Sequence, residues 1–370
     1  MKNVFFELLQ VSLGLRASLS VVPSTGDWSE LFKIAEEQAI MGVLLAGLDR
    51  LPASQRPPQL LLLEWIGQGE AIRQRNKAMD DALINLCQNM SEEKVEMFVF
   101  KGQTIAALYP KAGLRQSGDI DFFVFPKYWD KAISIIGRIE DGHSPNHVEY
   151  VENSVQYEMH RRMLTFSYSK HNSYWEKVVM PEITKNPFYV TIDGYEAPTL
   201  APTYNILYVF CHLFHHFIAD GVGLRQFIDW MMLLGNGGYD VETLDKHLKG
   251  LGLKKAFVGM GAVLTDYLGL PESEFPFEIS KKDHERTATI VDNIMRYGNF
   301  GHNEAYKNAS GVWHGVERLG RITKQSIRFG YLAPAESWGR IGFFFNWWSK
   351  KLTKKIKNCN NESIYCNSNI

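Results

Sequence analysis

In Arg115-Gln116-Ser117-Gly118-Asp119-Ile120-Asp121-Phe122-Phe123-Val124, two acidic residues enter an apolar run. The run from Ile120 to Phe125 predicts a buried β-strand. Because residues i and i+2 of a strand face the same side, Asp119 and Asp121 are expected to lie side by side. Ile120 and Phe122 would then face a core. Two like charges this close are unfavourable without a partner, and a divalent cation is the natural one.

A pair of carboxylates of this kind suits chemistry at phosphorus. Magnesium takes oxygen ligands, and proteins commonly hold it with one or two carboxylates together with substrate phosphates. Metal ions placed there support in-line displacement, because they activate the attacking oxygen and steady the leaving pyrophosphate. We therefore predict that Asp119 and Asp121 bind Mg²⁺ (or Mn²⁺) beside the phosphates of a substrate. The alternatives are a capped turn or a degenerate site.

The residues before this pair suggest a phosphate-binding turn. Met97 to Phe100 predicts a buried strand, and Ile105 to Tyr109 predicts a short helix. Gly102, between them, would let the backbone approach a phosphate near a helix N-terminus. Lys101 and Arg115 supply positive charge on either side. Lys101-Gly102 could instead be a plain strand-to-helix turn, and Arg115 could either bind triphosphate or pair with the carboxylates at rest.

A third carboxylate is expected on a neighbouring strand. The chain from His147 to Arg161 alternates in residue type around Asn153-Ser154, which predicts a β-hairpin. In this hairpin Glu158 has apolar neighbours and faces the same way as His160. We predict that Glu158 is the third acid of the site. The alternatives are a surface role for this residue, with the rival third acids Glu149 and Glu152.

These motifs resemble those of a known enzyme group. The resemblance rests on Phe100-Lys101-Gly102, then Tyr109-Pro110, then Arg115-x-Ser117-Gly118-Asp119-Ile120-Asp121-Phe122-Phe123-Val124. In them the chain is similar to a bacterial family of uncharacterised nucleotidyltransferases, within the superfamily that includes DNA polymerase β. The stretch from His212 to Leu234 resembles the same family through His216, Gly223-Leu224-Arg225 and Asp229-Trp230.

The resemblance implies metal-dependent transfer of a nucleotide from an NTP. Asp119 and Asp121 would be the metal ligands, with Glu158 as the third acid. The nucleotide-binding positions that it implies are Lys101, Gly102, Gln103, Arg115, Ser117 and Gly118. The chain departs from the superfamily pattern in two ways. Gln103 stands where that pattern usually has Gly or Ser, and the gap from Gly102 to Asp119 is longer than usual.

Helical patterns flank this α/β region on both sides. Strands are expected at Leu164 to Tyr168 and Tyr189 to Ile192, and helices at Leu60 to Met90, Tyr128 to Ile139, Tyr204 to Ile218, Leu224 to Leu234, Leu244 to Leu251, Ala256 to Leu268 and His284 to Tyr297. We predict an α+β fold, with a nucleotidyltransferase-like mixed β-sheet core between N-terminal and C-terminal helical regions. The expected divisions are residues 1–95, 96–200 and 201–357, with a disordered tail over 358–370.

The predicted helix from Tyr204 to Ile218 carries His212 and His216 on one face, because they are four residues apart. Position 213 holds no Glu, so the metalloprotease pattern fails. We place both histidines, together with His160, in a possible acceptor pocket. Arg225 and Asp229 are also four residues apart. They are expected either to form a buried pair that braces their helix or to line the same pocket.

Bulk properties exclude several other classes of protein. The formal net charge is −1 and the sequence pI is about 6.8, so no whole-protein field favours long nucleic acid. The four cysteines form no CxxC pair, which indicates a reducing, cytoplasmic setting. No apolar stretch reaches the length of about 18 residues expected of a transmembrane helix. The start of the chain is expected to be an amphipathic helix.

The end of the chain carries an apolar stripe beside a cluster of lysines. The stripe consists of Ile341, Phe344, Phe345, Trp348 and Leu352, and the basic residues are Lys350, Lys351, Lys354, Lys355 and Lys357. This pattern is typical of a helix docked on the protein with its basic end in solvent. The alternative is contact with a membrane surface.

The sequence thus favours a nucleotidyltransferase that moves a nucleotidyl group from an NTP to an unknown acceptor. The acceptor could be a small molecule, a protein side chain or an RNA end. One alternative is a regulatory or interaction protein that keeps the fold without turnover. Another is a toxin-like nucleotidyltransferase that acts on tRNA or protein.

Overall fold

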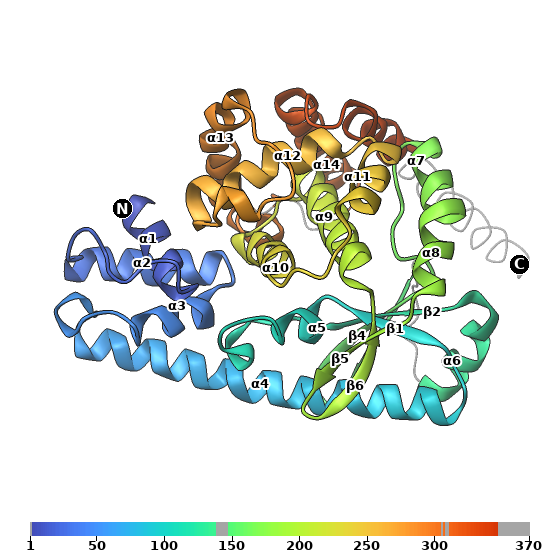
Figure 1. Cartoon of the computed structure of the whole chain (residues 1–370), viewed down its shortest axis with the longest axis horizontal. Helices are drawn as coiled ribbons and strands as arrows, with labels where there is room; N and C mark the ends of the chain where they lie inside the picture. Colours follow the sequence, from blue (N-terminus) through green and yellow to red (C-terminus); the bar gives the residue numbers. More distant parts are fainter. Residues whose placement is uncertain (1, 138–146, 305, 308–310, 347–370) are drawn as a thin grey trace, which may run out of the picture.

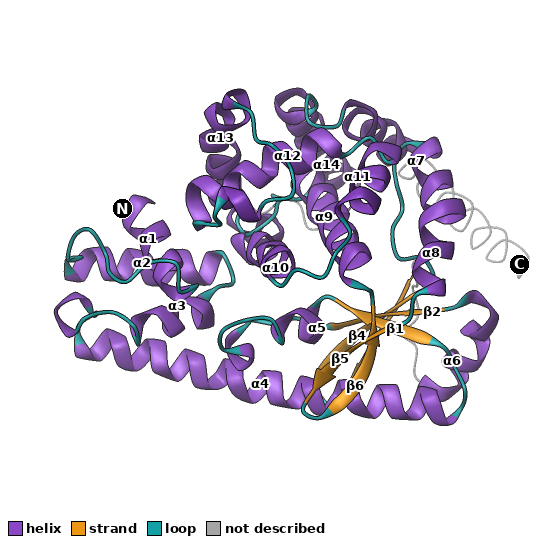
Figure 2. Ribbon diagram, viewed as in Figure 1, coloured by secondary structure: helices purple, strands orange, loops and turns teal. Residues whose placement is uncertain are grey.

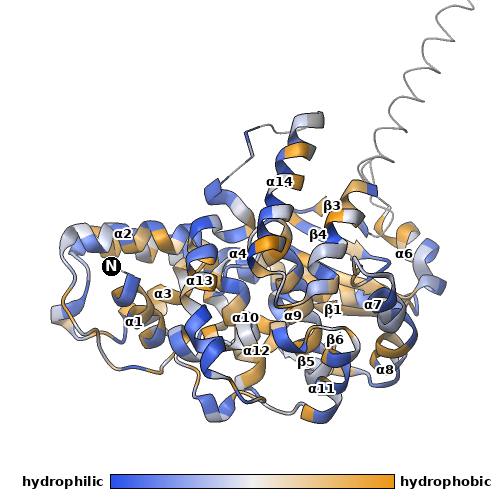
Figure 3. Cartoon of the chain, turned by 90° about the horizontal axis from the view of Figure 1, so that it is seen from above, coloured by the Kyte–Doolittle hydropathy of each residue, from blue (hydrophilic) through white to orange (hydrophobic). Residues whose placement is uncertain are grey.

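The computed structural model describes residues 2–137, 147–304, 306–307 and 311–346. They form an α+β fold in which a small sheet lies among many helices (Figures 1 and 2). The N-terminal helices are α1 (Lys2–Ser12), α2 (Thr25–Glu37), α3 (Met41–Leu48) and α4 (Gln59–Glu92). The outer face of α2 is polar and its inner face buries Trp28, Leu31 and Ala35, an amphipathic pattern visible in Figure 3.

A four-stranded mixed sheet forms the centre of the fold. Its strands are β1 (Met97–Phe100), β2 (Ile120–Val124), β3 (His147–Glu152) and β4 (Val155–His160), in the order β1-β2-β4-β3. The β2–β4 pair is parallel and the other two pairs are antiparallel. The predicted strands before and after Gly102 and the predicted hairpin are therefore confirmed. Asn153 and Ser154 adopt φ values of 49° and 65°, as a two-residue type I′ turn requires.

The two faces of this sheet have different roles. On one face Val99, Phe122 and Met159 belong to an apolar cluster that also contains residues of α4. The opposite face lies beneath α9 (Pro202–Ala219), and there the rings of Phe100 and Tyr208 are 4.8 Å apart. Because side chains alternate along β2, Asp121 faces α9 and not the apolar cluster.

A second sheet has only two strands, β5 (Phe188–Ile192) and β6 (Tyr195–Thr199). The first of them confirms the predicted strand at residues 189–192. The second was not predicted, although its turn, Asp193-Gly194 with both φ values positive, is a strong hairpin signal. The predicted strand from Leu164 to Tyr168 is wrong. Those residues pair with no strand, and their apolar side chains contribute to the helical core, where Phe166 packs against Trp175 and His215.

The remaining elements are mostly helices. They are α5 (Gly102–Ala106), α6 (Trp129–Ile136), α7 (Ser169–Tyr174), α8 (Met180–Lys185), α10 (Leu224–Gly235), α11 (Val241–Gly250), α12 (Lys254–Val263), α13 (Lys281–Tyr297) and α14 (Gly311–Phe329). Residues 334–346 form one more helix. The helices predicted between residues 204 and 297 are confirmed. In the part of the chain that the structure describes, no helix is long and apolar enough to cross a membrane.

The predicted C-terminal stripe is only partly described. Ile341 is half-buried and Phe344 is buried, whereas Phe345 is exposed. Trp348, Leu352, the lysine cluster and the predicted disordered tail lie outside the described residues. Whether this helix is docked or meets a membrane therefore stays a prediction, as do the domain divisions at residues 95 and 200.

Helix α4 connects the N-terminal helices to the sheet. With 34 residues it is about 51 Å long at a rise of 1.5 Å per residue. It contacts α3 near its start and β4 and β6 further along, and Figure 1 shows it running under both regions. It thereby brings residues such as Arg75 and Asn76 to the loop that precedes β2.

Candidate functional site

The register of the sheet brings the three predicted acids together. Asp121 of β2 lies opposite Glu158 of β4, and Asp119 precedes β2 on the same face. Carboxylate oxygens of Asp119, Asp121 and Glu158 all lie within 4.8 Å of one another. This separation suits oxygen ligands around one or two divalent cations.

The same register distinguishes Glu158 from its rivals. Glu149 lies opposite Glu158 but one strand further from Asp121, and its side chain is 58% exposed. Glu152 shares the face of Tyr150, which belongs to the apolar cluster under the sheet. Neither rival is therefore placed beside the aspartate pair.

Asp121 is the most strongly held of the three acids. It is 4% exposed, and its Oδ1 lies 3.1 Å from Lys101 Nζ and 3.0 Å from His160 Nε2. Burial alone would raise the pKa of Asp121. The Lys101 ammonium and the His160 hydrogen bond outweigh burial and lower that pKa to about 2. Asp121 is thus ionised at neutral pH. The carboxylates in turn raise the pKa of Lys101 despite its burial, so Lys101 acts as a fixed cation.

The pKa values of the other two acids, Asp119 and Glu158, are raised. Burial, reinforced by the charge of Asp121, raises the pKa of Asp119. Burial is also the main cause that raises the pKa of Glu158, to about 7, and the neighbouring aspartates add to it. The site thus holds more negative charge than Lys101 can balance, which is the condition that favours cation binding.

The raised pKa of Glu158 predicts a specific pH dependence of stability. The unfolded value is near 4.5 and the folded value near 7, so in metal-free protein the folded state holds the extra proton between these pH values. Ionised Glu158 therefore destabilises the folded protein as pH rises through this window. Glu158→Gln is expected to raise the urea midpoint at pH 8 in EDTA and to leave it unchanged at pH 4. Equal midpoints for the two proteins at pH 8 would contradict the raised pKa.

Lys101 reaches Asp121 from an unusual backbone conformation. Its φ and ψ are 58° and −152°, a region that only Gly normally occupies, and this costs about 1–3 kcal/mol. Gly102 follows with φ of 44° and opens α5 directly. Because the sharp turn at Lys101-Gly102 takes the place of a loop, α5 begins three residues earlier than the predicted helix. It ends at Ala106. Strain of this kind is common where a side chain must be aimed at a site.

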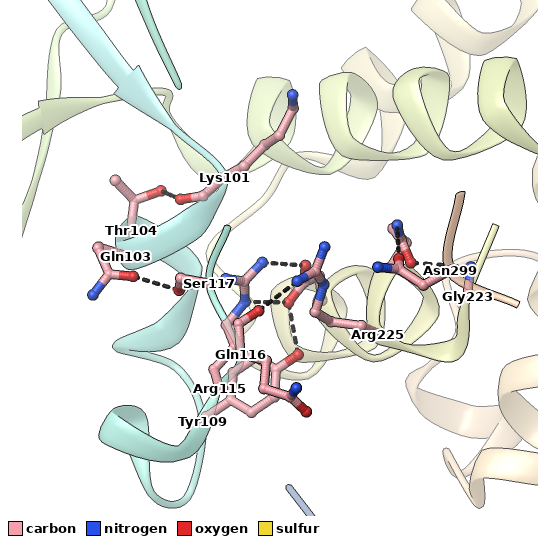
Figure 4. Close-up of polar contacts among 12 residues, drawn as sticks. Lys101, Gln103, Thr104, Tyr109, Arg115, Gln116, Ser117, Gly223, Arg225 and Asn299 are labelled. Atoms are coloured by element: carbon pink, nitrogen blue, oxygen red, sulfur yellow. Dashed lines mark hydrogen bonds and ion pairs between the residues drawn. The ribbon is translucent and has the colours of Figure 1, made fainter. Parts of the chain in front are cut away.

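Arg115 is fully engaged away from the carboxylate trio. Its Nε and Nη2 donate to the two oxygens of Asp229 at 2.7 and 2.6 Å, and Tyr109 Oη donates to the same carboxylate at 2.6 Å. Figure 4 shows Arg115 between Tyr109 and Arg225, with Lys101 pointing away from them. Neither alternative for Arg115 anticipated Asp229 as its partner. Asp229 also does not pair with Arg225 as expected, because Arg115 and Tyr109 occupy its oxygens.

Arg225 is the cation that this arrangement leaves available. Its Nη1 donates to the Gln116 carbonyl at 2.5 Å, while its Nε is buried and, among the described residues, has no hydrogen-bond partner. Among the same residues it makes no ion pair with a carboxylate. A partly buried guanidinium with no ion-pair partner is costly, so the position favours an anion.

The side chains of Gln103 and Ser117 are hydrogen-bonded to each other and do not line the cavity described below. Ser117 Oγ donates to Gln103 Oε1 at 2.5 Å, and Gln103 Nε2 donates to Asp80 Oδ1 of α4 at 2.5 Å. The first bond joins α5 to the loop before β2 (Figure 4), and the second joins α5 to α4. Their side chains are engaged within the protein, and their nucleotide-binding role stays a prediction.

A cavity of about 450 Å³ lies over the carboxylates, between the sheet, α9 and α10. Every predicted site residue except Gln103 and Ser117 lines it, including Gly102, Gly118, His160 and the candidate acceptor residues of α9 and α10. The sequence reading missed Arg75, whose Nη2 donates to the Gly118 carbonyl at 2.8 Å, and Phe300. No local motif marks either residue, because both come from distant segments.

His212 and His216 face the cavity from α9. Their rings are 4.4 Å apart, and the ring of Phe300 lies 5.0 Å from that of His216. Burial lowers the pKa of His212 well below its ordinary value and that of His216 to about 4, so both are neutral at pH 7. Neither belongs to a group of described residues that could hold a metal ion. They contribute aromatic, uncharged surface to the cavity.

Comparison with known proteins places this geometry in a family. Residues 24–269, more than half of the chain, match the model of a family described as uncharacterised nucleotidyltransferase. Among solved structures, the chain is similar to an antigenic nucleotidyltransferase-like protein from Paracoccidioides brasiliensis. The identity is 12%, the alignment covers 51% of this chain and 91% of that chain, and the TM-score is 0.32. No curated protein matches the chain.

Proposed function

Since the chain belongs to the uncharacterised nucleotidyltransferase family, we propose that it is a metal-dependent nucleotidyltransferase, which moves a nucleotidyl group from an NTP to an acceptor and releases pyrophosphate. The observation that carries this proposal is the convergence of Asp119, Asp121 and Glu158 under one cavity. Membership of the superfamily of DNA polymerase β and a bacterial source are parts of the same proposal.

Magnesium is the cofactor that this function implies, and the donor set fits it. Three carboxylates offer oxygen ligands within 4.8 Å, and their excess negative charge calls for a cation. Asp119, Asp121 and Glu158 would hold the ion. When bound, Mg²⁺ (or Mn²⁺) supplies Lewis-acid stabilisation of charge on the reacting phosphate.

The transfer itself is a displacement at the α-phosphorus. The acceptor oxygen forms a bond to that phosphorus, the bond between the α-phosphorus and the bridging oxygen breaks, and pyrophosphate leaves with the electron pair. The acceptor hydroxyl must lose its proton. Glu158 is the proposed base, because it lies beside the aspartate pair in the cavity and its surroundings raise its pKa to about 7 in the metal-free protein.

The cations of the cavity are placed to hold the triphosphate. Lys101 lies beside Asp121, and Arg225 lines the cavity with its Nε unpartnered. Arg75 enters from α4 at the Gly118 carbonyl. Arginine binds phosphate oxygens through its planar set of donors, and Lys acts as a point charge. We assign the triphosphate to this group of three cations.

The acceptor would enter on the side of α9. There His212 and His216 are neutral and Phe300 adds an aromatic ring. This surface suits an uncharged or aromatic part of a molecule more than an anion. A small molecule, a protein side chain and an RNA end all remain acceptors within the proposal.

The experiment that tests the function is isothermal titration of the full chain with each of the four NTPs, in Mg²⁺ and then in EDTA, followed by a pyrophosphate-release assay. Binding of at least one NTP in Mg²⁺ and its loss in EDTA are expected, because the carboxylates repel the triphosphate without a metal. Tight NTP binding in EDTA would contradict the metal-dependent site.

A second function has one observation in its favour. Gln103, where the superfamily usually has Gly or Ser, has its side-chain amide tied to Ser117 and Asp80. A regulatory or interaction protein that binds NTP without turnover fits this departure. It predicts magnesium-dependent NTP binding with no pyrophosphate release when candidate acceptors are supplied, whereas the proposed enzyme releases pyrophosphate with its acceptor.

A further inference from the structure

A second group of potential metal ligands shares Glu158 with the carboxylate trio. Ligand atoms of His147, Glu158 and His160 all lie within 4.8 Å of one another. The β3–β4 register explains this grouping, because His147 lies directly opposite His160, and Glu158 is two residues before His160 on the same face. Two imidazoles and one carboxylate thus project together from adjacent strands.

Two of the distances between donor atoms match those around a tetrahedral metal ion. Glu158 Oε1 lies 3.5 Å from His147 Nε2 and 3.6 Å from His160 Nε2. In a tetrahedral zinc site with bonds of about 2.0–2.2 Å, neighbouring ligand atoms are separated by roughly 3.3–3.6 Å. Two histidines and a glutamate, with a fourth position left to water, are also a ligand set that zinc accepts.

We propose that His147, Glu158 and His160 form a second cation site, specific for a transition metal of the zinc class and distinct from the all-oxygen magnesium site. Imidazole nitrogen favours such metals over Mg²⁺, which prefers oxygen ligands. Glu158 belongs to both donor sets. The binding claim stands without the proposed function. Only its consequence rests on that function: a transition metal here would draw Glu158 away from the magnesium site.

The metal would replace two existing contacts. His160 Nε2 is hydrogen-bonded to Asp121 Oδ1 at 3.0 Å, and His147 Nε2 contacts the exposed Glu149 Oε1 at 3.1 Å. Both nitrogens are therefore within hydrogen-bond reach of other acids at rest, while they already lie 3.5 and 3.6 Å from Glu158 Oε1. Without a metal site, this geometry would be a hairpin held by His–Glu hydrogen bonds, and the test must separate the two.

The test is direct binding of Zn²⁺ alone to the full chain, without NTP, with metal content after dialysis and titration as readouts. Loading the same protein with Cu²⁺, which also favours imidazole ligands, and recording the electron spin echo envelope modulation then reports whether imidazole nitrogen is coordinated. Wild type is expected to bind Zn²⁺ and to show the nitrogen modulation. His147→Gln is expected to weaken Zn²⁺ binding by at least roughly 10- to 100-fold and to reduce the modulation.

The matched control is His284→Gln. His284 is another partly exposed histidine, and its Nδ1 contacts Asp266 Oδ1 at 2.7 Å on a distant helix. The His284→Gln protein should bind Zn²⁺ as tightly as wild type. If His147→Gln binds Zn²⁺ as tightly as wild type, or Cu²⁺ shows no nitrogen modulation, the proposal is overturned. Asp119→Asn, outside this donor set, should keep the nitrogen signal.

This test separates the second site from the proposed function. A protein that binds Zn²⁺ through His147 and yet binds no NTP would keep the second site and remove the nucleotidyltransferase proposal. A protein that binds NTP with Mg²⁺ but shows no His147-dependent Zn²⁺ binding would do the reverse.

Discussion

Asp121→Asn is expected to abolish nucleotidyl transfer, with a loss on the order of 10³-fold or more, the scale seen when one preorganised charge-stabilising group is removed from an active site. Asp121 is buried and ionised, and it lies at the centre of the carboxylate trio. Asparagine keeps the shape of the side chain but offers a neutral oxygen. Magnesium-dependent NTP binding should fall with activity, in titration and in pyrophosphate release.

The fold should survive this substitution. Lys101, the buried partner of Asp121, keeps Asp119 and Glu158 as neighbouring charges, as their influence on its pKa shows. Circular dichroism of the variant is expected to match wild type, whereas its urea midpoint at pH 7 should fall, because the lowered pKa of Asp121 means that its ionised form stabilises the folded protein. Asp245→Asn is the control: this carboxylate pairs with Lys249 and Lys254, far along the chain, and its loss should leave NTP binding unchanged. An Asp121→Asn protein with activity within tenfold of wild type would falsify the assignment of Asp121 as a metal ligand.

Arg115→Lys is expected to give the largest loss of stability, about 1.5–3 kcal/mol, because lysine cannot make both of the hydrogen bonds that Arg115 donates to the buried Asp229 carboxylate. The two side chains are 5% and 7% exposed, and the pair joins the loop before β2 to α10. Lysine supplies one charged nitrogen where the guanidinium makes two parallel hydrogen bonds. The measurement is the urea midpoint and its slope, followed by both far-ultraviolet circular dichroism and tryptophan fluorescence.

The matched control is Arg318→Lys. Arg318 also holds a carboxylate, Asp220, through Nε and Nη2, both at 3.1 Å, but its side chain is 32% exposed. Solvent screens this second pair, so its loss should cost no more than about 1 kcal/mol. Similar shifts of the urea midpoint for the two variants would contradict a larger contribution of the Arg115–Asp229 pair to stability. If the Arg115→Lys protein is too unstable to purify, Tyr109→Phe, which removes one neutral donor to Asp229, provides a milder test of the same network.

The sequence sufficed for the elements nearest the acids. Apolar runs identify β1 and β2, and Asn153-Ser154 identifies the β3–β4 hairpin, because turn chemistry and period-two alternation are local signals. The same turn also fixes the register of the hairpin. A two-residue turn at 153 and 154 pairs Glu152 with Val155, and counting outward from this pair puts His147 opposite His160. The second donor group could therefore have been predicted.

Contacts between distant segments could not be read in the same way. Arg115 and Asp229 are 114 residues apart, and nothing local in either segment selects the other. The same holds for Arg75 and Phe300 at the cavity. The false strand at Leu164 to Tyr168 has a related cause: the alternation of Leu164, Phe166 and Tyr168 with polar residues reports burial but not the partner against which these side chains are buried.

In the resting site, the Lys101 ammonium serves as the counter-ion of the Asp121 carboxylate. A cation that takes Asp121 competes with the ammonium, so its entry is an exchange and not a simple addition. The released ammonium is then available to an anion in the cavity. Cation and anion binding at this site are thereby linked, and by thermodynamic reciprocity each raises the affinity for the other by the same factor.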